Sequence, residues 1–233
     1  MDSEAVLSRL AELRETGLAI GLSLSGPAQS ETLLKAMSVE FDGRPLFSAV
    51  QATWNLLAQE AGDSLSQAHD AGMGIIVKEA LANGRLTSRN RDPAFVNRRM
   101  MLEESARSLD TTIDALALAA VLAQPWVDVV LSGAANIEHM MSNVQALNVK
   151  RGEWLDHLLV SLREKPEAYW RIRSGLNWNE GKLPGTAWPD QVTTVLPRFA
   201  GPLPLALHRS LHFFPLKDFW PLSDSVLQVL RPA

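Results

Sequence analysis

The segment of residues 127–147 constrains the fold more than any other stretch of the chain. It begins with a short apolar run, residues 127–131, typical of a buried strand, and it ends with apolar residues at helical spacing. Four small residues, SGAA at 132–135, lie between them. A strand, a small-residue turn and a helix in this order leave the first helical N–H groups open to an anion such as a phosphate. The sequence therefore predicts a phosphate-binding turn here.

Strand-like runs also precede this segment and alternate with helical stretches. Apolar runs typical of strands occupy residues 18–24, 46–51, 74–77 and 127–131. Helical periodicity occupies residues 3–16, 30–37, 65–71, 92–105, 111–121 and 154–162, and a last short helix starts at Pro166. This alternation predicts an α/β chain with right-handed βαβ units and a parallel sheet. A doubly wound sheet and a barrel both satisfy it.

Polar or small residues end each predicted strand. They are Ser23-Leu24-Ser25, Gln51, Lys78-Glu79 and Ser132-Gly133. The carboxyl ends of parallel strands meet at one rim of the sheet, where α/β proteins place their sites. Any one of these residues can simply mark the end of a strand. Four together predict a functional site on that rim.

Four stretches carry a family resemblance. They are residues 17–26 (GLAIGLSLSG), 49–57 (AVQATWNLL), 74–87 (GIIVKEALANGRLT) and 129–147 (VVLSGAANIEHMMSNVQAL). In order and spacing they resemble the fifth to eighth βα units of the aldo/keto reductases. Residues 167–179 (EAYWRIRSGLNWN) are similar to the end of some plant and cyanobacterial-type members. The resemblance implies a domain over residues 1–180, the C-terminal half of a (β/α)8 TIM barrel with about four βα units.

The family reduces carbonyls with NADPH, so the resemblance implies an NADP(H) site on the predicted rim. Ser23 and Gln51 match positions that contact the nicotinamide carboxamide. Lys78 falls where many members place an aromatic residue against the nicotinamide ring, and Leu81 falls along the pyrophosphate. Leu24 replaces the asparagine that usually follows the serine.

The resemblance places the adenosine end of the cofactor at the turn of residues 132–135. The matching residues there are Ser132, Gly133, Ala134 and Ala135, followed by His139 and Asn143. His139 falls where many members use an arginine near the 2′-phosphate, and Asn143 lies on the adenine side. Histidine is neutral for much of the range around pH 7, so it grips a phosphate less firmly than arginine. Without the resemblance, His139 is best read as a solvated residue on a helix face.

The family's catalytic Asp, Tyr, Lys and His come from the first half of the barrel, and the tyrosine is the proton donor. The single tyrosine of this chain, Tyr169, lies in the C-terminal segment. We therefore expect a cofactor-binding half that is inactive alone toward carbonyl substrates. A half barrel exposes strand edges, so it can self-associate, pair with a separately encoded half or stay loosely packed. A truncated gene is the simplest explanation.

Several residues allow other interpretations. Lys78 can form a Schiff base, because burial lowers the pKa of an amine, and Glu79 is its expected charge partner. A basic stretch is expected on a solvated face rather than at a phosphate: Arg85, Arg89, Arg91, Arg98 and Arg99. Four aromatic residues are expected to pack rather than to line a substrate site: Trp154, Tyr169, Trp170 and Trp178.

Composition narrows the classes of partner and site. A net charge of −4 gives no reason to expect a nucleic acid or a membrane partner. The absence of cysteine excludes disulfides and thiolate chemistry, and no histidine spacing indicates a metal site. A cysteine-free chain fits a reducing compartment, here expected to be the cytoplasm, with a plastid as the alternative. Residues 181–233 form a proline-rich tail that is expected to be irregular or disordered.

Three functions follow from these observations. The first is an NADPH-dependent carbonyl oxidoreductase, of which this chain is the cofactor-binding half. The second is a non-catalytic dinucleotide-binding or regulatory module, and the third is a Schiff-base lyase that uses Lys78.

Overall fold

The computed structural model describes residues 3–176 and 228–230. The chain divides into two compact units, residues 1–173 with 223–233, and residues 174–222. The first unit holds the sheet and the helices that form the candidate site. Trp178 and nearly all of the proline-rich tail lie outside the described residues.

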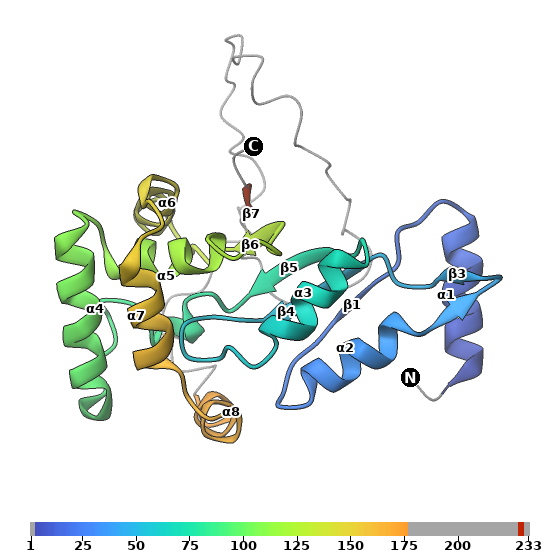
Figure 1. The fold of residues 1–233 in the computed structure, drawn as a ribbon, viewed down its shortest axis with the longest axis horizontal. Helices are drawn as coiled ribbons and strands as arrows, with labels where there is room; N and C mark the ends of the chain where they lie inside the picture. Colours follow the sequence, from blue (N-terminus) through green and yellow to red (C-terminus); the bar gives the residue numbers. More distant parts are fainter. Residues whose placement is uncertain (1–2, 177–227, 231–233) are drawn as a thin grey trace, which may run out of the picture. The chain divides into compact units, whose positions relative to one another are not determined.

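Four parallel strands lie side by side in their order along the chain (Figure 1). They are β1 (Gly21–Ser23), β4 (Ala49–Thr53), β5 (Gly74–Lys78) and β6 (Val129–Leu131). A doubly wound sheet reverses its strand order part-way, whereas a barrel adds each strand beside the last. The order observed here is consistent with a partial barrel. A further strand, β7 (Gln228–Leu230), pairs antiparallel with β6.

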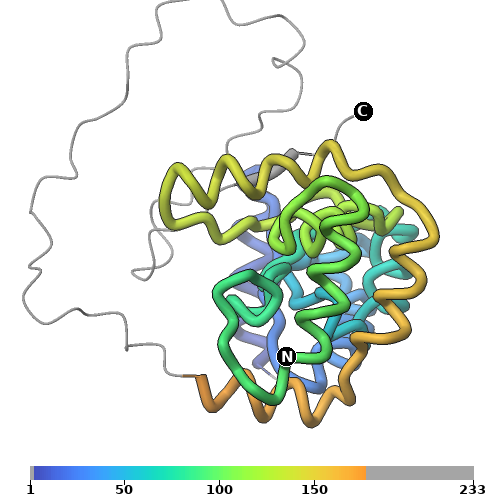
Figure 2. Tube along the Cα trace, turned by 90° about the vertical axis from the view of Figure 1, so that its left-hand side faces the viewer, coloured from blue at the N-terminus to red at the C-terminus, as the bar shows by residue number. Residues whose placement is uncertain are grey.

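Helices connect these strands and pack around the sheet (Figure 1). The α-helices are α1 (Glu4–Glu15), α2 (Gln29–Met37), α3 (Gly62–Asp70), α4 (Val96–Ser108), α5 (Ile113–Leu122), α6 (Ile137–Val144), α7 (Glu153–Leu162) and α8 (Pro166–Ser174). The described residues also include the 3-10 helices η1 (Ala82–Gly84), η2 (Pro93–Phe95) and η3 (Gln145–Asn148). In Figure 2 the segment from α6 through α7 to α8 passes around the outside of α4 and α5.

The core forms two apolar clusters. One lies around the sheet, where Val50, Ile75 and Val130 are fully buried. The other joins α4, α5, α7 and α8 around residues such as Leu116 and Leu158. Helix α5 is apolar on nearly every side and nine of its ten residues are buried, as expected for a helix between two packed layers. These clusters hold the carboxyl ends of the strands in fixed positions.

Three details differ from the sequence-based expectation. The hairpin of β2 (Glu40–Phe41) and β3 (Arg44–Pro45) was not predicted, because two-residue strands carry no periodicity. The spacing of Leu33, Leu34 and Met37 predicts that all three point inward from α2, but Leu34 is 45% exposed and Ala36 is buried instead. The sequence predicts Thr111 as the N-cap of α5, but Thr112 takes this position, and its Oγ1 accepts a hydrogen bond from the N–H of Ala115 at 3.1 Å.

None of the helices in the described residues is both long enough and apolar enough to cross a bilayer.

Two valine substitutions test the core. Val50→Ala removes two methyl groups from a fully buried position, so we expect it to lower the free energy of unfolding by about 1.5–3 kcal/mol. Val160→Ala is the matched control. Because Val160 is 83% exposed, this substitution should change the free energy of unfolding by less than about 0.5 kcal/mol. Chemical denaturation measures both. Equal effects would contradict the described packing.

Candidate functional site

The carboxyl ends of β4, β5 and β6 open onto a cavity of about 560 Å³. Its lining comes from these strand ends and from the loop that follows β5. The residues are Gln51, Lys78, Glu79, Ala80, Leu81, Asn83, Gly84, Thr87, Arg89, Leu131, Ser132 and Gly133. Five of the ten residues predicted to bind the cofactor therefore line one cavity.

A chain of hydrogen bonds links three adjacent strands at this rim. Lys78 Nζ donates to Ser23 Oγ at 3.0 Å, and Ser23 Oγ donates to Gln51 Oε1 at 2.9 Å. The parallel register places Ser23 directly beside Gln51. Burial lowers the pKa of Lys78, the negative charge of Glu79 opposes this shift and the positive charge of Arg173 adds to it. Lys78 is therefore a half-buried amine that is easier to deprotonate than an ordinary lysine.

The turn after β6 holds polar atoms that lack partners. The N–H of His139 bonds to the Asn136 side chain at 2.8 Å, so part of the first turn of α6 is already capped. Asn143 Nδ2 donates to the carbonyl of Ser132 at 3.1 Å. Asn143 Oδ1 and Ser132 Oγ are buried without a hydrogen-bond partner in the described chain. Unpaired buried polar atoms are costly, so these two are candidates for contact with a polar ligand.

An arginine and a histidine lie together beside the turn. The Arg89 guanidinium contacts the His139 ring through a short hydrogen bond, and Arg89 lines the cavity. Arg89 is exposed, as expected for the basic stretch, and it also lines the cavity. Arg85 and Arg98 depart from the expected solvated face, since both bind the buried carboxylate of Glu164 at 2.6 Å and 2.5 Å.

A buried carboxyl group, Asp114, lies near this pair. Burial raises the pKa of Asp114, and a backbone hydrogen bond from Ser88 and the charges of Arg89 and His139 oppose the shift. Its Oδ1 has no hydrogen-bond partner in the described chain. The Arg89 guanidinium therefore lies near a carboxyl group that is only partly hydrogen-bonded, which leaves the guanidinium able to bind an anion.

Glu79 binds a different cation from the one expected. Its carboxylate pairs with Arg173 of α8, with Nη2 at 2.5 Å and Nε at 3.1 Å from Oε1, whereas the sequence suggested Lys78. The described geometry thus leaves Lys78 bonded to Ser23 rather than to an acid.

Tyr169 lies away from the cavity lining. Its hydroxyl is 3.0 Å from Asn55 Nδ2, its side chain is buried, and burial raises its pKa well above the ordinary tyrosine value. Trp170 is also buried and donates to Glu60 at 3.0 Å, while Trp154 donates to the carbonyl of Lys150. These three aromatic residues pack as expected, and Tyr169 is not placed to donate a proton to a ligand in the cavity.

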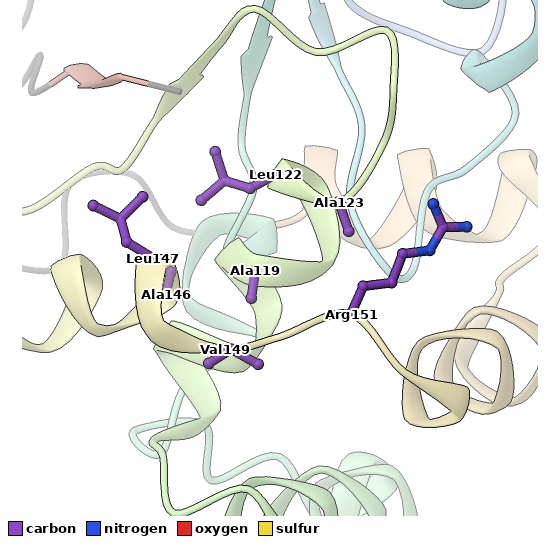
Figure 3. Close-up of a pocket in the computed structure, with 7 residues that line it drawn as sticks. All are labelled: Ala119, Leu122, Ala123, Ala146, Leu147, Val149 and Arg151. Carbon is purple, nitrogen blue, oxygen red and sulfur yellow. The ribbon is translucent and has the colours of Figure 1, made fainter. Parts of the chain in front are cut away.

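A second cavity of about 200 Å³ lies away from the strand ends, between α5 and η3 (Figure 3). It is lined by Ala119, Leu122, Ala123, Ala146, Leu147, Val149 and Arg151. Figure 3 shows the Arg151 side chain extending away from Leu122 and Leu147. None of the predicted cofactor-binding residues lines this cavity.

The family model described as "Aldo/keto reductase family" matches residues 1–152, about two thirds of the chain. The chain belongs to the aldo/keto reductase family. Comparison with curated proteins gives no match.

Solved structures of aldo/keto reductases support the fold of this chain. The thermostable aldo-keto reductase Tm1743, in complex with the inhibitor epalrestat, is 24% identical with a TM-score of 0.50, and the match covers 67% of this chain and 53% of that one. The aldo-keto reductase AKR11C1 from Bacillus halodurans, in its apo form, is 20% identical with a TM-score of 0.55, covering 70% and 59%. Its holo form is 21% identical with a TM-score of 0.53, covering 68% and 55%.

The chain spans between 53% and 59% of these structures. At such identities the likeness shows the fold alone.

The structure links the remaining predicted residues to the cavity without placing them in its lining. Ser23, His139 and Asn143 each bond to a lining residue. Ala134 is buried and Ala135 is exposed in the turn itself. Arg89 was missed because charge alone does not locate a side chain. The signal that could have found it is its place in the connection after β5, since such connections lie at the carboxyl rim.

The pKa of Lys78 can be measured by competitive labelling of amines with acetic anhydride at several pH values. Because burial favours the neutral amine, we expect its titration midpoint to lie below the ordinary lysine value of about 10.4. As pH rises, Lys78 should therefore become reactive before an ordinary lysine does. The variant Lys78→Arg assigns the labelled peptide. A midpoint at or above the ordinary value would contradict the described burial.

Proposed function

We propose that this rim binds NADP(H) and that the chain supplies the cofactor-binding half of a carbonyl oxidoreductase. One observation carries the proposal. Residues from separate strands converge on a single cavity, and two buried polar atoms beside it, Ser132 Oγ and Asn143 Oδ1, have no partner in the described chain. Members of the aldo/keto reductase family generally use NADP(H), and this donor set suits such a ligand.

Different residues of the rim would bind different parts of a dinucleotide. Ser23 and Gln51 supply a hydroxyl and an amide for the nicotinamide carboxamide. Leu81 lies in the loop proposed to run along the pyrophosphate, and the turn of residues 132–135 would hold the adenosine end. When bound, the cofactor supplies a hydride for carbonyl reduction. This chain's residues bind and orient it.

Arg89 is the best candidate to bind the 2′-phosphate that distinguishes NADPH from NADH. His139 accepts a hydrogen bond when its ring is neutral, so its contact with Arg89 orients the guanidinium without needing a second charge. A guanidinium stays charged and presents a planar set of donors that matches phosphate geometry. Arg89, from the loop after β5, thereby compensates for the weaker phosphate binding that is expected of a histidine at position 139.

Carbonyl reduction requires a proton donor, which is a tyrosine in this family. Tyr169 cannot take this role at the described rim, because it is buried and its hydroxyl contacts Asn55. We propose that the acid comes from a first barrel half, which also completes the pocket for a small carbonyl substrate. Strand β1 forms one edge of the sheet, so this edge could pair with a strand of such a first half, or with a second copy of the chain.

The buried position of Tyr169 also favours a second candidate, a non-catalytic dinucleotide-binding module. The two candidates differ in one measurement. Adding a first barrel half should produce carbonyl-dependent NADPH oxidation if the chain is the cofactor-binding half, and none if it is a binding module. Turnover by the chain alone would contradict both.

A third candidate, Schiff-base chemistry at Lys78, is favoured by the lowered pKa of that amine. The amine would add to an aldehyde and lose water to give an imine, which borohydride reduces to a stable secondary amine. Trapping of a small aldehyde on Lys78, identified by peptide mass, would support this candidate. Absence of the adduct would remove it.

Arg89→Gln tests the proposed site. Because it removes a charge-assisted contact to the 2′-phosphate, we expect NADPH affinity to fall about tenfold while NADH affinity changes less than about twofold. Fluorescence titration measures both affinities. Arg107→Gln is the matched control, since Arg107 is exposed on α4 and should leave both unchanged. Equal loss for the two cofactors would contradict the assignment of Arg89.

A further inference from the structure

Backbone strain is concentrated in the loop that lines the cavity. Five non-glycine residues of the described chain have positive φ, and three of them follow β5: Glu79 at 56°, Ala82 at 48° and Asn83 at 55°. The left-handed region is unfavourable for residues that carry a Cβ, so such conformations persist only where their surroundings enforce them. Something outside the loop must therefore hold residues 79–84 in place.

Helix α8 and Asn55 make the contacts that hold Glu79. Arg173 binds its carboxylate at two points, with Nη2 at 2.5 Å and Nε at 3.1 Å from Oε1. The backbone carbonyl of Glu79 accepts a hydrogen bond from Asn55 Nδ2 at 2.9 Å. The hydroxyl of Tyr169 lies 3.0 Å from the same nitrogen. Residues 169 and 173 are four apart on α8, so one helix face binds the Glu79 side chain through Arg173 and contacts, through Tyr169, the Asn55 amide that binds the Glu79 backbone.

The held loop includes much of the cavity wall. Glu79, Leu81 and Asn83 line it, and Lys78 directly precedes the strained residue. The Arg173 guanidinium is only partly exposed and lies 5.4 Å from the centre of the Trp170 ring, so packing restricts its own freedom. A change at Arg173 should therefore reach the cavity through Glu79.

We propose that Arg173 is a positioning residue: by binding Glu79 it holds the loop of residues 79–84 in the conformation that accepts a dinucleotide. Helix α8 lies beyond residues 1–152, which match the family model, so this contact is an addition to the matched domain. The identity of the ligand rests on the proposed function. The effect of Arg173 on the conformation of the loop is independent of that function.

Hydrogen exchange tests the loop directly, without cofactor. Inside it, the N–H of Ala82 bonds to the carbonyl of Glu79 at 2.8 Å and the N–H of Gly84 bonds to that of Leu81 at 3.0 Å. We expect Arg173→Gln to speed exchange of these two amides about tenfold while the amides of β5 stay protected. Arg107→Gln is the matched control, because it makes the same charge change at an exposed position of α4. Equal exchange in the two variants would overturn the proposal.

Measurements of cofactor affinity then distinguish a positioning role of Arg173 from an effect of its charge alone. Arg173→Gln should weaken NADPH binding about five- to tenfold. Arg173→Lys keeps the charge but loses the two-point contact, so its NADPH affinity should lie between those of Arg173→Gln and the native chain. The double variant Arg173→Gln with Glu79→Gln restores the local charge balance. If Arg173 positions the loop, the double variant stays weak. If it regains native affinity, Arg173 acts only by cancelling the Glu79 charge and the proposal is wrong.

The outcomes distinguish this proposal from the proposed function. Faster loop exchange in Arg173→Gln, with no NADPH binding by the native chain, supports the hold on the loop and removes the NADP(H) assignment. Native NADPH binding that Arg173→Gln leaves intact supports the assignment and overturns the positioning role. Thermal unfolding of each variant identifies any loss of fold, in which case Arg173→Lys provides the comparison.

Discussion

The parallel pairing of β4 with β5 is the interaction on which the rest of the structure depends. Five residue pairs, from Ala49 beside Gly74 to Thr53 beside Lys78, place both carboxyl ends at one rim. Strand β1 joins through Gln51 and Ser23, and β6 joins through Ile76 and Val77. Without this register Lys78, Gln51 and Ser23 would not form one chain of hydrogen bonds. The cavity follows from backbone pairing first and from side-chain chemistry second.

Two kinds of support keep this rim in place. Beneath it, apolar side chains such as Val50 and Ile75 exclude water from the sheet. Above it, polar side chains fix the loops: Asn55 accepts the N–H groups of Leu57 and Ala58, and Glu164 binds two arginines. Buried polar networks of this kind specify a conformation because each unpaired member would cost free energy. Strained residues in the loop after β5 can persist only within such a frame.

Much of the fold could be predicted from the sequence because apolar periodicity reports which face of an element is buried. The runs at residues 46–51 and 74–77 correspond to β4 and β5, although their ends shifted by a few residues. Strand order within the sheet needed either the structure or the family resemblance, since both barrel and doubly wound sheets share the same local pattern. The two-residue hairpin strands left no pattern to detect.

The site was predictable where it depends on strand ends and unpredictable where it depends on loops. Lys78 ends β5, Ser132 follows β6 and Gln51 lies two residues before the end of β4, so the rule for parallel sheets locates all three near one rim. Arg89 and Arg173 reach the rim from a loop and from a distant helix, and no spacing in the sequence reports such contacts. The same holds for Glu79, whose partner lies 94 residues away rather than next to it.

A crystal structure of the chain grown with NADPH is the most direct test of the central claim. The account predicts that the dinucleotide occupies the cavity at the carboxyl ends of β4, β5 and β6, with its adenosine end against Ser132 and Gly133 and its 2′-phosphate on Arg89. A dinucleotide bound elsewhere on the chain, or none bound at saturating concentration, would contradict it.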